Sequence, residues 1–179
     1  MQYFIGIVTP DEYLEKIIRF QHQWGNNVLT NVVEPHITIK AQGGLTSDES
    51  WLIQVMKVCE DFPPFEVTLD KPMFFGESVL FLSIESTEIR TLHNKLIQAI
   101  SPSEDLIKKY LELENYVPHL TLGQSNYGLT VQELDEMAKR VEKELIPYPT
   151  FKVNILRVYQ EIEPNKYIKY MDIPLKKQS

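Results

Sequence analysis

The 179-residue sequence lacks the features that mark secreted and membrane proteins. It contains one cysteine, Cys59, so no internal disulfide can form, and this residue lies in an apolar helical stripe typical of a protein core. No apolar run approaches the ~20 residues of a bilayer-spanning helix. The N-terminal residues have no basic segment of the kind that begins a signal peptide. We therefore expect a cytoplasmic protein with no membrane segment.

Basic residues are scarce as well. The chain has 18 Lys and Arg against 25 Asp and Glu, which gives a formal net charge of -7 at pH 7. Proteins that bind long nucleic acids without regard to sequence neutralise many phosphates with Lys and Arg. The composition therefore argues against a long nucleic acid as the partner, although it allows a local pocket that holds one phosphate.

Several catalytic signatures are missing. The seven glycines form no phosphate-cradling loop of the kind that binds nucleoside triphosphates. No carboxylate cluster stands out, and no set of His, Cys, Asp and Glu has the spacing of a zinc site. We expect chemistry that needs neither a metal nor a cofactor.

What the sequence does contain is an alternation of strand and helix patterns. Short aliphatic and β-branched runs predict strands, and apolar residues at helical spacing predict helices. The predicted strands cover residues 3–8, 36–40, 65–69, 79–85, 117–123, 151–162 and 166–173. The main predicted helices cover residues 10–24, 47–59, 87–100 and 131–145. Thr9, Thr46 and Thr130 each stand three residues before a Glu, which predicts a capping box at the start of three of these helices.

The two halves of the chain repeat one order of elements: strand, helix, His-containing strand, helix, strand. His36 lies 29 positions before Phe65, and His119 lies 32 positions before Phe151. We interpret this agreement as an internal duplication. It predicts a single domain, residues 1–179, with two lobes from the halves, approximately 1–75 and 79–173. The fold class is α+β (or α/β): pseudo-twofold-related lobes of antiparallel-rich sheet with outer helices around a central cleft.

The most informative repeat is a short motif that occurs once in each half. Residues 33–40 read VEPHITIK and residues 117–123 read VPHLTLG. Side chains alternate between the two faces of a strand. His36 and Thr38 therefore share one face, as do His119 and Thr121, while the aliphatic residues between them face the core. If the lobes meet across a twofold axis, two imidazoles and two hydroxyls surround one point.

Such a constellation suits phosphate chemistry. One neutral imidazole can remove a proton while the other, protonated, delivers one to a leaving oxygen. The hydroxyls of Thr38 and Thr121 can donate hydrogen bonds to phosphate oxygens. By strand alternation Lys40 also faces the site and could add charge against the phosphate, although a Lys at a strand end is as often simply solvated. Gly123, its counterpart, could leave room for a nucleoside or ribose.

The paired motifs, His36-Ile37-Thr38-Ile39 and His119-Leu120-Thr121-Leu122, resemble the two signatures of the 2H phosphoesterase superfamily, the 2′-5′ RNA ligase-like proteins. The resemblance covers the whole chain and includes small bacterial members whose substrates are unknown. It implies a bilobal fold and hydrolysis of a 2′,3′-cyclic phosphate or related 2′-5′ linkage on a small nucleotide or an RNA terminus. It also implies that His36 and His119 are the catalytic acid–base pair.

Two other interpretations stay open. The same cleft could bind a nucleotide or an RNA end without turnover. Alternatively, the repeat is only architectural and both histidines are structural. Four further residues are given no role in the site. His93 lies beside the apolar stripe of a helix. The others, Tyr116, Arg157 and Tyr159, are most simply ordinary strand residues. The sequence does not say which His is the base or what the oligomeric state is.

Overall fold

A computed structural model describes residues 1–177 of the chain. Within them, five α-helices, three short 3-10 helices and eight strands are present. They follow in the order β1 (Tyr3–Ile7), α1 (Asp11–Gln21), η1 (Val28–Asn31), β2 (Ile37–Lys40), α2 (Leu52–Asp61), β3 (Phe65–Phe75), β4 (Val79–Glu85), α3 (Thr87–Ile100), α4 (Glu104–Lys109), η2 (Leu113–Asn115), β5 (His119–Gln124), η3 (Ser125–Tyr127), α5 (Val131–Glu144), β6 (Thr150–Val153), β7 (Ile155–Glu163) and β8 (Lys166–Pro174). The predicted α+β class is confirmed.

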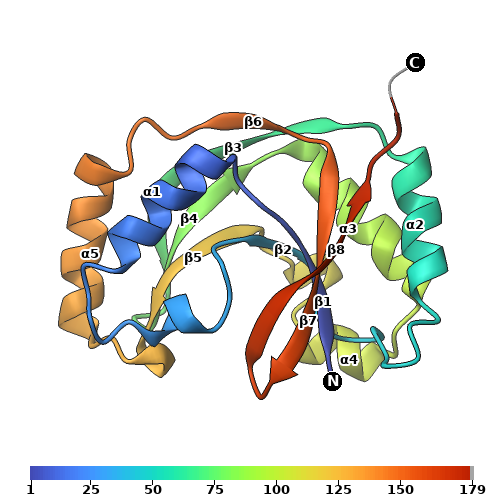
Figure 1. The fold of residues 1–179 in the computed structure, drawn as a ribbon, viewed down its shortest axis with the longest axis horizontal. Helices are drawn as coiled ribbons and strands as arrows, with labels where there is room; N and C mark the ends of the chain where they lie inside the picture. The colour runs from blue at the N-terminus through green and yellow to red at the C-terminus, as the bar shows by residue number, and fades with distance from the viewer. Residues whose placement is uncertain (178–179) are drawn as a thin grey trace.

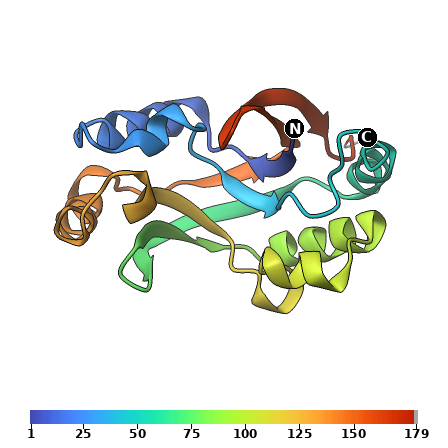
Figure 2. The same cartoon turned by 90° about the horizontal axis from the view of Figure 1, so that it is seen from below.

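All eight strands belong to one antiparallel sheet with the order β6-β3-β4-β5-β2-β1-β7-β8. The two strands that carry the His motifs, β2 and β5, are neighbours at its centre. Helices α1 and α5 lie on one side of the molecule, and α2, α3 and α4 on the other (Figure 1). Figure 2 shows the same two groups from below, with the central strands between them.

The lobes do not coincide with the two halves of the chain. Helix α1, from the first half, packs against β5, from the second, while α3 packs against β2. Likewise β7, near the C-terminus, pairs with β1. The exchange occurs because β6 and β7 are two stretches of one segment, separated only by Asn154: β6 adds to β3 at one edge, and β7 continues to β1 (Figure 1). Elements from both halves of the sequence therefore build each side of the molecule.

The strand registers fit a pseudo-twofold axis nonetheless. Ile37 and Leu120 occupy the same place in the two motifs, and they pair directly between β2 and β5. Glu66 and Lys152, which follow the equivalent residues Phe65 and Phe151, also pair directly. Equivalent residues that face each other lie near the axis that relates the halves, so the axis passes between β2 and β5 and between β3 and β6.

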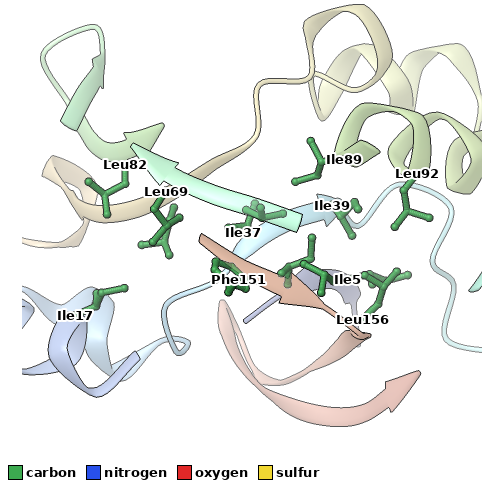
Figure 3. Packing of buried hydrophobic residues seen from close by; sticks show 14 of the residues in the cluster. Ile5, Ile17, Ile37, Ile39, Leu69, Leu82, Ile89, Leu92, Phe151 and Leu156 are labelled. Carbon is green, nitrogen blue, oxygen red and sulfur yellow. The ribbon is translucent and has the colours of Figure 1, made fainter. Parts of the chain in front are cut away.

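The core lies between the sheet and its helices. The aliphatic residues of both motifs, Ile37, Ile39, Leu120 and Leu122, are fully buried there. Figure 3 shows Ile37 and Ile39 packed among side chains from helices and neighbouring strands. Burial of one such side chain contributes about 1.5–3 kcal/mol. This packing holds each motif strand in place and leaves its other face for the site.

Of the three predicted capping boxes, only the one at Thr130 forms, where Thr130 and Glu133 bond reciprocally at the start of α5. At Thr9 the prediction is wrong, because Pro10 is the N-cap residue and the Thr9 hydroxyl is buried without a partner. At Thr46 it is also wrong, because the hydroxyl bonds to Asp48 and α2 begins only at Leu52. A loop of turns fills the interval. Among the described residues, no helix has the length and apolar character to cross a membrane.

Candidate active site

The central strand pair brings the two motifs together. Because β2 and β5 are antiparallel and Ile37 faces Leu120, His36 lies beside Thr121 and Thr38 beside His119. All four side chains line one cavity of about 360 Å³. The sequence predicted these four residues as the site, and the structure places them together.

The rest of the cavity wall is aromatic, aliphatic or amide in character. Phe4, Tyr110 and Tyr167 contribute rings, and Gln42 and Gln124 contribute amides. None of the described residues that line it is Lys or Arg. The sequence analysis missed these wall residues, since Phe4, Tyr167, Tyr110 and Gln42 come from β1, β8 and loops that carry no motif, and Gln124 lies at the end of β5, beyond its motif. The only signal for the rings was the aromatic content of those segments.

Both histidines are held in the same way. The Nδ1 atom of His36 lies 2.8 Å from the carbonyl oxygen of Glu34, and that of His119 lies 2.7 Å from the carbonyl of Val117. A carbonyl oxygen only accepts, so each Nδ1 carries the proton and donates it. Each neutral ring then has its lone pair on Nε2. Nε2 makes no hydrogen bond within residues 1–177 and is the ring atom available to a ligand.

Burial lowers the pKa of both imidazoles, and each ring packs against two aromatic rings, His119 against Phe75 and Phe81 with centroids 5.0 and 5.4 Å away. Burial, opposed by the Glu34 carbonyl and reinforced by the charge of His119, lowers the pKa of His36 to about 4. Burial also lowers the pKa of His119, and the Val117 carbonyl opposes this. His36 packs against Phe4 and Tyr159 with ring centroids 4.7 and 5.3 Å away. His36 is therefore strongly disposed to be neutral.

A charged network lies behind His36. Arg157 donates to the Glu34 carboxylate at 2.9 Å and to both oxygens of Asp172 at 2.7 and 3.0 Å. The hydroxyl of Tyr159 donates to the same Glu34 oxygen at 2.8 Å. The side chain of Glu34 is thus held by Arg157 and Tyr159, while its backbone carbonyl orients the ring of His36. Arg157 and Tyr159 have defined structural partners, and neither lines the site cavity.

The hydroxyls of Thr38 and Thr121 are free of such partners. Neither makes a hydrogen bond within the described residues, and both side chains line the cavity. The backbone carbonyl of Thr38 accepts from the Tyr116 hydroxyl at 2.9 Å, which fixes the strand behind it. The two hydroxyls can therefore donate to a ligand without breaking an internal bond.

Lys40 does not reach the site. Its ammonium is fully buried and contacts the carbonyls of Ala41 and Gly43 at 2.7 and 2.6 Å and the Glu112 carboxylate at 2.6 Å. The cause is a β-bulge: Thr38 pairs with Gly6 but Lys40 pairs with Ile5, so one extra residue shifts the alternation. Lys40 therefore does not line the site cavity, contrary to the prediction from strict alternation.

Gly123 shows the same displacement in the other motif. A register shift in β5 lets Thr121 pair with Phe81 and Gly123 with Leu80. A Cβ at Gly123 would meet side chains of the core beneath α5, including Leu129 at 2.6 Å. The glycine therefore leaves room for core packing, and the predicted space for a nucleoside lies elsewhere.

His93 is a buried structural residue. Its Nδ1 donates to the carbonyl of Ile39 at 2.7 Å, and its Nε2 accepts from the backbone N–H of Leu113 at 2.9 Å. Its ring stacks on Tyr116 with centroids 3.9 Å apart. Within residues 1–177, no group of three or more His, Cys, Asp and Glu side chains is arranged to hold a metal ion.

A bilobal antiparallel sheet that presents two His-x-Thr strands to one cavity defines a phosphoesterase of the 2H type. The family model described as the 2′-5′ RNA ligase superfamily matches residues 9–164, and the chain belongs to this superfamily. The resemblance read from the motifs is thereby confirmed, and with it the expectation of an enzyme of the phosphoesterase class.

Solved structures share the fold over its whole extent. TT0787 of Thermus thermophilus superposes with a TM-score of 0.67 at 15% identity, over 100% of both chains. Escherichia coli LigT complexed with 3′-AMP gives 0.63 at 17% identity, over 98% of both chains. A structure titled phosphoesterase gives 0.64 at 17% identity, over 98% of this chain and 99% of that one. No curated protein sequence matches the chain.

Proposed function

We propose that the protein is a metal-independent phosphoesterase that opens a cyclic phosphodiester by paired-histidine acid–base catalysis. The substrate class is a 2′,3′-cyclic phosphate of a small nucleotide or RNA end, or a related 2′-5′ linkage. The observation that carries the proposal is the single cavity lined by His36, Thr38, His119 and Thr121.

The charge of the cavity supports a diester as substrate. Since no Lys or Arg lines it among the described residues, its positive charge comes from a protonated imidazole. A cyclic phosphodiester carries one negative charge, whereas the monoester formed by its hydrolysis carries up to two at neutral pH. One imidazolium therefore balances the substrate better than the product, which favours product release.

The proposed mechanism uses both Nε2 atoms. Water attacks phosphorus in line with the leaving ribose oxygen, and one neutral imidazole takes its proton. The other, protonated, gives a proton to the leaving oxygen. His36, with the pKa of about 4, suits the base, and His119 suits the acid. The hydroxyls of Thr38 and Thr121 donate to the non-bridging oxygens, where charge accumulates in the transition state.

Ligands named for a protein of the same fold support a small nucleotide as substrate, since LigT is also described in complex with NADP+ and with ATP. LigT structures are described as complexes with 3′-AMP and with phosphate. A 3′-monophosphate is one of the two products that opening of a 2′,3′-cyclic phosphate can give. For the present chain we propose a small nucleotide or a short RNA terminus, in keeping with its net charge of -7.

The proposal is tested by hydrolysis of 2′,3′-cyclic nucleotides and short RNAs with a 2′,3′-cyclic end, in the presence of a chelator. We expect turnover by the wild type that is lost in His36→Ala and in His119→Ala. The matched control is His22→Ala, because His22 is exposed at the end of α1. Binding of nucleotides without any turnover would instead indicate a binding module.

A further inference from the structure

A second cavity, of about 190 Å³, opens beside His119. Thr38, Ala41, Tyr110 and His119 line both this cavity and the site cavity, so the two are contiguous. His36 and Thr121 do not line it. It therefore adjoins the catalytic centre on one side only. We call it the side cavity.

The side cavity has an apolar rim that faces solvent. Phe75, Leu111 and Val117 line it and expose 37%, 64% and 44% of their surface. Large apolar side chains gathered at one opening mark a binding surface more often than single exposed residues do. The walls add the rings of Tyr110 and Tyr116, while the carboxylate of Glu112 is held by Lys40. Such a lining suits a flat, largely apolar group.

The loop that forms one wall is held in a strained shape. Leu111 and Leu113 have φ of 52° and 57°, the left-handed region that branched side chains rarely adopt. Between them, Glu112 accepts from Lys40 at 2.6 Å and from the backbone N–H of Ala41 at 3.2 Å. Strained residues persist where their surroundings fix them, and they cluster at ligand sites.

On the opposite side of the centre, the pocket that His36 and Thr121 line outside the site cavity measures only about 20 Å³. There Phe4 stacks on Tyr159 with ring centroids 4.5 Å apart, and both rings pack against His36. Behind them Glu34 and Arg157 form an ion pair at 2.9 Å. Outside the site cavity, a flat ring attached to the phosphate therefore finds more apolar space beside His119 than beside His36.

We propose that the side cavity binds the heterocyclic base of the nucleotide whose phosphate lies between His36 and His119. This inference rests on the proposed function and specifies the orientation of its substrate. The ribose then lies on the His119 side. The P–O bond to the ribose breaks and the oxygen takes a proton from His119, while a P–O bond to water forms and the water proton passes to His36.

The test compares 2′,3′-cyclic AMP with glycerol 1,2-cyclic phosphate, which has the reacting ring but no base. Leu111→Ser should raise KM for cyclic AMP about tenfold, because it removes apolar contact with the base. It should leave the kinetics of the base-free substrate unchanged. The matched control is Ile53→Ser, since Ile53 exposes 61% of its surface on α2 and lies outside both cavities.

The possible negative results separate failure of the base site from failure of the proposed function. If Leu111→Ser affects both substrates equally, or neither, the side cavity does not bind the base, and the proposed function stands. If the wild type hydrolyses neither substrate, the proposed function is contradicted. The base site is then decided by binding of 3′-AMP, which should shift the methyl NMR signals of Leu111 but not those of Ile53. Unshifted Leu111 signals in the presence of bound 3′-AMP would overturn the inference.

Discussion

At the scale of single residues, the imidazoles of His36 and His119, which we propose as the acid–base pair, are each oriented by a backbone carbonyl two positions earlier in the chain. This bond fixes the tautomer and directs Nε2 to the ligand. Burial lowers the pKa of both rings below the ordinary value of 6.5. The fixed tautomer leaves Nε2 of each ring available to the ligand, as the proposed acid–base mechanism requires.

The pH dependence of kcat/KM should follow from these shifts. Activity requires a neutral base, so it rises with pH through the lower pKa, near 4 for His36. It also requires a protonated acid, so it falls with pH through the pKa of His119, which lies below 6.5. We expect a bell-shaped profile with both limbs below pH 6.5. A profile that keeps rising above pH 7 would contradict the assignment.

The two Thr hydroxyls should act on the transition state. A hydrogen bond to a charged group contributes about 1.5–3 kcal/mol, so Thr38→Val and Thr121→Val should each lower kcat/KM about 10- to 100-fold. Thr→Ser at either position keeps the hydroxyl and should retain most activity. Melting temperatures serve as the control, and a Val variant with full activity would exclude a phosphate contact at that position.

Arg157 should act as a positioning residue through Glu34. The Glu34 charge raises the pKa of His36, and Arg157 neutralises that charge. Arg157→Met should therefore shift the acidic limb of kcat/KM to higher pH, and Glu34→Gln should shift it to lower pH. Steady-state profiles measure both variants. A purely structural pair would leave the limb in place while it lowers stability.

At the scale of elements, two β-bulges determine the positions of Lys40 and Gly123, and the sequence did not predict either bulge. Strict alternation of side chains along β2 predicted that Lys40 shares a face with Thr38. The alternation is observed as far as Thr38 and is broken by the bulge that follows. A bulge has no compositional signature here: the residue at the shift, Ile39, is an ordinary strand former. Two of the predicted helix caps are likewise absent: Pro10 and Trp51 are the N-cap residues, and neither makes a side-chain cap hydrogen bond.

The buried pair of Lys40 and Glu112 should stabilise the loop beside the side cavity. Burial lowers the pKa of Lys40 and raises that of Glu112, and each partner opposes the shift of the other. Removal of one partner of a buried pair costs about 3–5 kcal/mol, so Lys40→Met should lower the free energy of unfolding by that order. Lys40→Met combined with Glu112→Gln should recover much of the loss.

Denaturant unfolding measures this effect, and phosphate affinity of the folded variant provides the contrast. Since the ammonium of Lys40 is enclosed, we expect inorganic phosphate to bind Lys40→Met as it binds the wild type. A variant of normal stability with weakened phosphate binding would show that Lys40 does contact the phosphate.

At the scale of the whole molecule, the site exists because the sheet brings equivalent strands together. The sequence revealed the repeated motifs, since His and Thr are unusual in an apolar run. It also revealed the α+β class, since helix and strand patterns alternate. It could not reveal the exchange of α1 and β7 between the two sides, because local patterns do not record which strands pair across the sheet.

The buried imidazoles should make the protein sensitive to acid. The pKa of His36 and that of His93 are both lowered to about 4, mainly by burial. The unfolded chain therefore binds protons at a pH where the folded chain does not. The contribution of these two neutral imidazoles to the stability of the fold is complete above pH 6.5 and is lost as the pH falls through 4. Replacement of His36 by Asn should flatten part of the decline in melting temperature over this range, and an unchanged decline would contradict the lowered pKa of His36.

The central claim, that His36 and His119 act as one catalytic pair, is tested most directly by a double-mutant cycle on the hydrolysis of 2′,3′-cyclic AMP. Each single Ala variant should lose about 10²- to 10⁴-fold in kcat. Because groups that act together have non-additive effects, the double variant should be little slower than either single one. If the double variant, folded and free of contaminating activity, still turned over at the wild-type rate, the paired-histidine account would be wrong.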